Sequence, residues 1–132
     1  MNTFRAKLLD TTHTEVFENA TSFVGEDISG SFGLLAGHEH FVTCLIFGLA
    51  RLQVEDGSWI YIALPGGVLS FVDNLLTVTA RHVVTDRDYE RITTILEEQL
   101  RDEEEQLRTM KHSLHSMEIE LLKRLSETER LP

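Results

Sequence analysis

Two histidines offer the clearest metal-binding chemistry in this sequence. His38 and His40 are separated by Glu39, and on a β-strand residues i and i+2 point to the same face. Two imidazoles on one face can form half of a zinc or iron site. His82 could complete such a site from another part of the chain. The alternative is a turn that carries polar side chains and binds no metal.

The spacing around these histidines favours the polar turn. Together with Gly33, the pair resembles the metal motif of cupins, but the glycine is one residue too close. No carboxylate follows His40 at the interval that the motif needs. We therefore assign no metal ligands and no cofactor, and we keep a cupin-like enzyme using His38, His40 and His82 as an alternative.

The remaining reactive side chains do not form an active site in sequence. His112 and His115 are three residues apart, without an acid on that helical turn, which favours a solvated or partner-facing pair. Cys44 lies in the apolar run Phe41–Phe47, so we expect a buried thiol. The pair Gly66-Gly67 lacks the Lys-Ser/Thr of a phosphate loop. The sequence therefore predicts a binding or coupling role and no enzymatic activity of its own.

Composition limits the classes of partner. The chain has 132 residues, 42% of them hydrophobic, and a formal net charge of −10. An acidic chain repels phosphate backbones and anionic lipid, so its charge disfavours nucleic-acid binding and a polybasic membrane mode, and we expect neither. The longest apolar run, residues 41–50, is shorter than the roughly 20 residues that span a bilayer. We expect membrane association through protein contacts only, without direct insertion.

The first part of the chain predicts short strands joined by tight turns. All eight glycines occur by Gly67 and all seven phenylalanines by Phe71. Asp56-Gly57, Pro65-Gly66-Gly67 and Asp73-Asn74 separate apolar runs at the spacing of an antiparallel sandwich or barrel. This pattern predicts a β-sandwich domain over residues 1–84.

The second part, residues 85–132, predicts helix. Thr85 is the expected N-cap, with carboxylates in the first turn. Apolar residues then recur every three or four positions, which is the coiled-coil period, and this repeat predicts a stripe for a partner helix. The stripe comprises Leu96, Leu100, Leu107, Met110, Leu114, Met117 and Leu121. We expect an α+β chain: an N-terminal antiparallel β-sandwich followed by an α-helical hairpin, with a turn near 102–105 or 109–113, or by one long helix.

Two glycine motifs resemble one family. Residues 30–45 read GSFGLLAGHEHFVTCL, similar to the G-x-x-G-I-L-P-G-H-x-P-L-x-T-x-L of epsilon subunits of F-type ATP synthases. Residues 66–80 read GGVLSFVDNLLTVTA, similar to that family's G-G-x-x-E-V-x-x-N-x-V-T-V-x-A. Ala36, His40, Ser70 and Phe71 depart from these patterns. The departures indicate the branch of the alternate-type F-type ATPase.

The resemblance implies a non-catalytic subunit of the central stalk. It implies a sandwich that contacts the gamma subunit and the c-ring, and helices that reach the alpha/beta catalytic head and restrain ATP hydrolysis. By motif position we expect Ser31, Phe32, His38 and His40 to contact the c-ring or gamma. The complex would lie at the cytoplasmic face of the cell membrane, coupling proton or sodium-ion transport to ATP synthesis.

Some members of that family bind ATP through a motif like I/L-D-x-x-R-A. Asp88 and Arg91 retain its acid and its base, whereas Arg87 and Ile92 replace its aliphatic residue and its alanine. The alternative interpretation is an ion pair on a helix. A different class of function also stays open, a free-standing adaptor that oligomerises through the Leu96–Leu121 stripe. A stable homodimer or trimer in light scattering would favour the adaptor.

Overall fold

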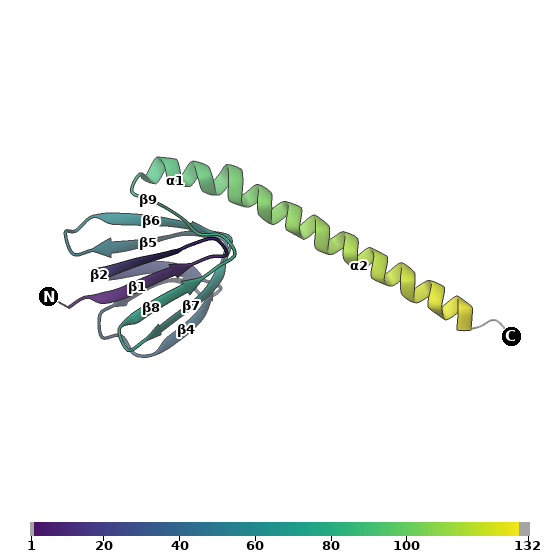
Figure 1. Ribbon diagram of the computed structural model, residues 1–132, viewed down its shortest axis with the longest axis horizontal. Helices are drawn as coiled ribbons and strands as arrows, with labels where there is room; N and C mark the ends of the chain where they lie inside the picture. Colours follow the sequence, from purple (N-terminus) through teal and green to yellow (C-terminus); the bar gives the residue numbers. More distant parts are fainter. Residues whose placement is uncertain (1, 130–132) are drawn as a thin grey trace. The chain divides into compact units, whose positions relative to one another are not determined.

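The structure is a computed structural model that describes residues 2–129, with side-chain burial described through residue 126. Nine strands form the first part of the chain (Figure 1). They are β1 (Phe4–Leu9), β2 (Thr14–Asp27), β3 (Gly30–Leu35), β4 (Phe41–Leu45), β5 (Gly48–Val54), β6 (Trp59–Leu64), β7 (Gly67–Val72), β8 (Leu75–Thr79) and β9 (Val84–Asp86). Three helical segments follow: α1 (Tyr89–Ile95), a π-helical turn η1 (Leu96–Leu100) and α2 (Arg101–Glu129).

The long strand β2 belongs to both layers of the sandwich. Its first half pairs with β1, and its second half pairs with β3 and β5. The pairing with β5 is irregular between Ala20 and Ser22, and such an irregularity bends a strand. One layer therefore runs β4–β7–β8–β1–β2, and the other runs β3–β2–β5–β6–β9. The predicted sandwich is confirmed, and its pairs are antiparallel except for β1 with β8.

Aromatic side chains fill the space between the layers. Phe4, Phe23 and Phe71 are almost completely buried. The rings of Phe4 and Phe71 meet edge to face with centroids 5.4 Å apart. Such a pair stabilises the fold by about 0.5–1.5 kcal/mol beyond the contribution of the buried area. Three of the seven phenylalanines thus form the centre of the core, and Phe17, Phe32 and Phe41 pack partly buried against it.

Glycine is required at both Gly66 and Gly67, for a different steric reason at each position. Gly66 turns the chain between β6 and β7 with a φ of +113°, a conformation that side chains rarely adopt. Gly67 lies so close to β8 that a Cβ there would be 2.6 Å from the carbonyl oxygen of Thr79. The first glycine is needed for its backbone angle and the second for a close approach.

The first helical segments pack on the outside of β6. Ile92 and Leu100 are buried against Ala63, together with the partly buried Leu96. The N-cap is Asp88, whose carboxylate accepts hydrogen bonds from the backbone N–H groups of Glu90 and Arg91. The expected cap at Thr85 is wrong, because Thr85 lies in β9 and its hydroxyl binds Glu15 instead.

The second compact unit is the helix α2. The chain divides into units of residues 1–100 and 101–132, whereas its composition changes near residue 84. Within the second unit α2 is one helix of 29 residues without a break. The chain makes no turn at residues 102–105 or 109–113. Of the two expected forms, the structure has the single long helix rather than the hairpin.

We expect Gly67→Ala to lower the free energy of unfolding by about 1–3 kcal/mol, because the added methyl group must push β7 away from β8. Gly33→Ala is the matched control, since its Cβ would have Phe23 O at 3.8 Å as nearest neighbour. Urea unfolding followed by circular dichroism measures both. Equal stability of the two variants would contradict the steric explanation.

Candidate docking surfaces

Strands β4 and β7 expose apolar side chains on the outside of the sandwich. We call Val42, Cys44, Val68, Ser70 and Val72 the valine face. The register places Val42 opposite Ser70 and Cys44 opposite Val68, so the five side chains share one side of the sheet. Val42 is 68% exposed, Val68 51% and Val72 39%. The expectation of a buried Cys44 is wrong: the thiol is exposed on this face.

The adjoining strand β8 extends the same surface without adding charge. Leu75, Thr77 and Thr79 lie opposite Val72, Ser70 and Val68. None of these side chains is ionisable, although 26% of the residues of the chain are charged. A continuous exposed surface without charge is typical of a protein–protein interface.

A second exposed apolar group is the tip of the β2–β3 hairpin. Ile28 is 97% exposed there. The carboxylate of Asp27 fixes the turn by accepting hydrogen bonds from the hydroxyl of Ser29 at 2.6 Å, its N–H at 2.9 Å and the hydroxyl of Thr43 at 2.7 Å. The two hydroxyl donors hold the pKa of Asp27 below its ordinary value. The hairpin tip is therefore a braced turn that presents one isoleucine.

The predicted contact residues have different environments. Ser31 is exposed on β3, while Phe32 is half-buried between Phe23 and Phe41, with ring centroids 6.3 and 5.3 Å away. His38 is exposed and stands edge-on to Phe41 at 5.8 Å. The Nε2 of His40 lies 3.4 Å from Oδ1 of Asp73 in the next turn. Ser31, His38 and His40 are therefore accessible to a partner, whereas Phe32 packs among core aromatic rings.

The structure does not gather the histidines into a metal site. His38 and His40 have different partners, since Nδ1 of His38 donates to the carbonyl of Glu39 at 2.8 Å. Within residues 2–129, no three His, Cys, Asp or Glu side chains are grouped to hold a metal ion. The cupin-like alternative also needed His82. The described residues do not form a ligand set for it.

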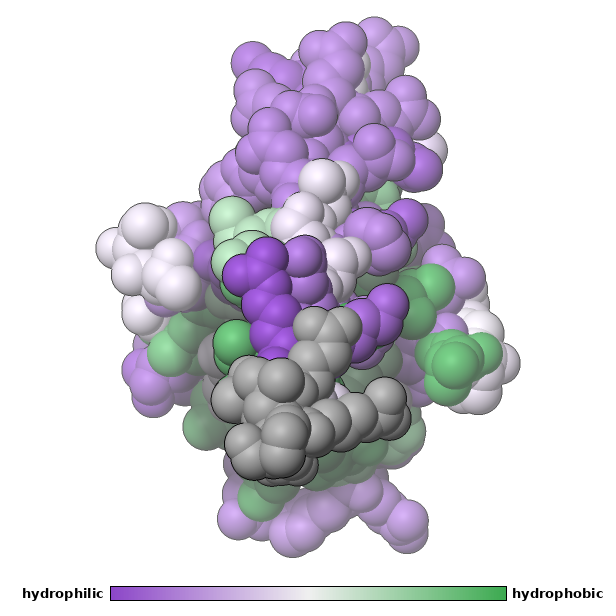
Figure 2. Space-filling model, turned by 90° about the vertical axis from the view of Figure 1, so that its right-hand side faces the viewer, coloured by the Kyte–Doolittle hydropathy of each residue, from purple (hydrophilic) through white to green (hydrophobic). Residues whose placement is uncertain are grey.

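The predicted helix stripe divides between the two units. Leu100 is fully buried and Leu96 is partly buried within the first unit. Along α2, Leu107 is partly buried, and Met110, Leu114, Met117 and Leu121 are 59–66% exposed. Figure 2 shows hydrophobic residues, in green, that reach the surface between hydrophilic residues in purple. The part of the stripe on α2 is therefore exposed.

Among the residues described, no helix combines the length and the hydropathy needed to cross a bilayer.

Asp88 and Arg91, the residues of the nucleotide motif, have partners within the chain. Asp88 caps α1, and Arg91 binds the carboxylate of Asp86 through Nε at 2.7 Å and a terminal nitrogen at 3.1 Å. The side-chain hydrogen bond from Arg91 holds the pKa of Asp86 below its ordinary value. The predicted ion pair on the helix is therefore replaced by one that joins α1 to β9.

Sequence reasoning missed the valine face and the hairpin tip. A signal for the face was present in Phe41–Leu45 and Val68–Val72. Both segments have apolar residues at odd and at even positions, so apolar side chains point to both faces of the sheet. The exposure of Ile28 left no such signal. The short segment Glu26-Asp27-Ile28 does not show which of its side chains would face the core and which would face solvent.

The similarity to a known protein family lies in the sandwich domain. Residues 3–86 match the family model described as ATP synthase, Delta/Epsilon chain, beta-sandwich domain. ATP synthase epsilon chain 2 of Cereibacter sphaeroides is 37% identical over 83 residues, 62% of this chain and 57% of the relative. The ATP synthase epsilon chain of Streptomyces coelicolor is 34% identical over 61 residues, 46% of this chain and 49% of the relative. The matches thus span about half the length of these relatives.

Two solved assemblies contain chains of the same fold. A chain of the Euglena gracilis mitochondrial ATP synthase, in a structure of OSCP, F1 and c-ring, has a TM-score of 0.57 at 23% identity and covers 70% of this chain and 61% of that one. A chain of the Tetrahymena thermophila mitochondrial ATP synthase central stalk and c-ring has a TM-score of 0.53 at 12% identity, with 64% and 69% covered. The family model alone matches more than half of the chain. The chain therefore belongs to the family of ATP synthase delta/epsilon chains, as its two glycine motifs predicted.

Proposed function

We propose that the chain is the epsilon subunit of the central stalk of an ion-translocating F-type ATP synthase. It transmits torque between the c-ring and the catalytic head and has no catalytic site of its own. Membership of the family supports this role, as do its fold neighbours, which come from assemblies of F1, central stalk and c-ring. It would be peripheral to the membrane, at the cytoplasmic face, held there by its partners.

The observation that carries the proposal is the valine face. Transfer of apolar area from water yields about 25 cal/mol per Å², and Val42 and Val68 are each more than half exposed. The adjoining strand β8 adds only hydroxyl and aliphatic groups, and the first charged side chains on this side of the sheet, Arg5 and Lys7, come one strand further, on β1. A partner that covers this face gains hydrophobic energy without desolvating a charge. We infer that the gamma subunit is this partner.

The hairpin tip suits a second contact, with the c-ring. Ile28 projects from a turn that Asp27 braces by hydrogen bonds to Ser29 and Thr43. Because the turn is already ordered, docking costs little conformational entropy. The accessible Ser31, His38 and His40 are the predicted contacts that would extend this surface.

The apolar stripe of α2 is assigned to a regulatory contact. Met110, Leu114, Met117 and Leu121 recur at the coiled-coil period and are exposed. We infer that this stripe lies along gamma and the alpha/beta head and restrains ATP hydrolysis.

We expect Val68→Asp to weaken binding to purified gamma at least tenfold, about 1.4 kcal/mol, because the partner would have to desolvate a carboxylate. Isothermal titration calorimetry measures the affinity, and circular dichroism checks the fold. Leu35→Asp is the matched control: Leu35 is 63% exposed but pairs with Ser22 in the other layer. Unchanged binding by Val68→Asp would exclude the valine face as the gamma surface.

Deleting residues 106–132 should raise the ATP hydrolysis rate of the assembled complex, because it removes the α2 stripe. Met117→Asp should raise the rate as well. Ile119→Asp should leave it unchanged, since residue 119 is two positions from both Met117 and Leu121 and points away from them on a helix. If hydrolysis is the same in the complete and the shortened complex, the stripe does not restrain it.

We expect ATP to leave the melting temperature of the isolated chain unchanged, because Arg91 would have to leave Asp86 to reach a phosphate. Thermal unfolding with millimolar ATP measures this. A rise in the melting temperature that disappears in Arg91→Gln would instead assign nucleotide binding to Asp88 and Arg91.

A further inference from the structure

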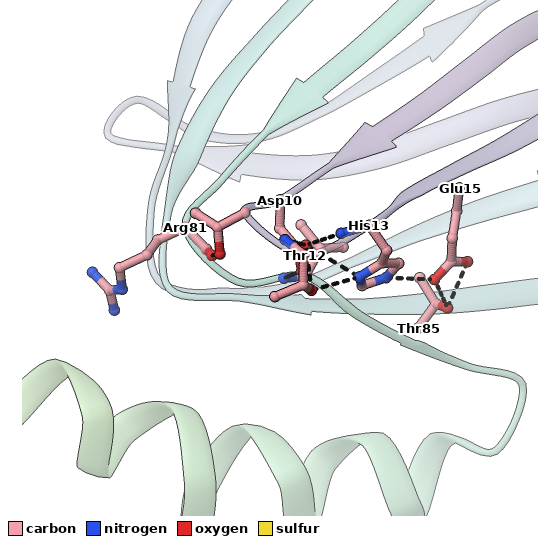
Figure 3. Close-up of polar contacts among 8 residues, drawn as sticks. Asp10, Thr12, His13, Glu15, Arg81 and Thr85 are labelled. Carbon is pink, nitrogen blue, oxygen red and sulfur yellow. Dashed lines mark hydrogen bonds and ion pairs between the residues drawn. The ribbon is translucent and has the colours of Figure 1, made fainter.

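Residues 10–15, which form the β1–β2 connection and the start of β2, bind the segment that leads into the helices. The N–H of Val83 donates to Oδ2 of Asp10 at 2.9 Å, and the hydroxyl of Thr85 lies 2.9–3.0 Å from both carboxylate oxygens of Glu15. The hydroxyl of Thr11 also donates to the carbonyl of Arg81 at 3.3 Å. These contacts join residues more than 65 positions apart in the chain. We call Asp10, Thr12, His13 and Glu15 the clamp (Figure 3).

Asp10 is the fixed centre of the clamp. Its side chain is 1% exposed. Burial alone would raise the pKa of Asp10, but N–H donors from Val83, Thr12 and His13 and the hydroxyl of Thr12 outweigh burial and hold the pKa well below its ordinary range. A carboxylate with these donors stays ionised at every pH at which histidine titrates.

His13 lies between the two carboxylates. Its Nδ1 is 3.1 Å from Oδ1 of Asp10, and its Nε2 is 3.2 Å from Oε1 of Glu15. The hydroxyl of Thr12 is 3.0 Å from Nδ1 and 2.9 Å from Oδ1 of Asp10. Asp10, Thr12 and Glu15 thus contact the ring, whereas the guanidinium of Arg81 points away from it in Figure 3.

The network needs one more proton than neutral side chains supply. A neutral imidazole has one N–H, so one ring nitrogen presents a lone pair. If Nδ1 carries the lone pair, the single hydroxyl proton of Thr12 can serve either Nδ1 or Asp10, but not both. If Nε2 carries it, no proton lies between Nε2 and the carboxylate of Glu15. A protonated ring donates from both nitrogens, which leaves the Thr12 hydroxyl free to donate to Asp10. Every contact in the clamp is satisfied only with the imidazolium form.

We propose that His13 is a proton-sensitive clasp, which holds the β9 segment more tightly to the β1–β2 connection when its ring is protonated. Strand β9 pairs with β6 over only three residues, Val84, Thr85 and Asp86. The N-cap of α1, Asp88, follows two residues later. The clasp therefore acts on the short strand from which the helical part of the chain begins. This inference does not depend on the proposed partners.

Amide hydrogen exchange of the complete chain, followed by NMR at pH 5.5 and 7.5, tests the proposal. Rates are corrected for the intrinsic effect of pH and referred to the amide of Leu69 in the core. The Val83 amide should be about two- to fivefold more protected at pH 5.5, the range for a partly exposed ion pair. In His13→Gln this difference should disappear. His40→Gln, which removes a histidine paired with a carboxylate in another turn, should keep it.

A second variant tests the centre of the clamp separately. Asp10→Asn should reduce protection of the Val83 amide at both pH values, because an amide cannot accept from all of the donors that surround Asp10. The proposal is overturned if the wild type shows no pH difference at Val83, or if His13→Gln retains the wild-type difference.

Discussion

A β-sheet has two faces, and in β4 and β7 both of them are apolar. The inward side chains Leu45, Leu69 and Phe71 pack between the layers, and that packing commits the outward valines to the surface because successive side chains alternate. No change of rotamer can hide Val42 and Val68 while the core stays intact. The same strands that hold the fold together therefore expose the apolar face that we assign to a partner.

Much of the architecture could be predicted from local patterns. Asp73-Asn74 marked a hairpin turn, and both residues have positive φ. The change from two-residue to seven-residue periodicity located the start of the helical part within a few positions. The glycine motifs identified the family, and the steric demand at Gly67 explains why part of one motif exists.

Other features depend on contacts between distant residues. Thr85 and Asp88 are both good N-cap residues, and the choice between them is made by Glu15, which binds Thr85 and keeps it in β9. Leu96 and Leu100 fit the same repeat as Leu114, but β6 is within reach of the first two and buries Leu100. The clamp residues are close in sequence, but they bind Val83 and Thr85 about 70 positions away, so no sequence window contains both sides of the contact.

The valine face has a practical consequence through its thiol. Cys44 is the single cysteine of the chain and lies exposed among the valines. A thiol-specific fluorophore or spin label would therefore attach at one position, on the β4 side of the surface assigned to gamma. Its emission or mobility would report whether that surface is wet or covered, without engineering a new attachment point into the protein.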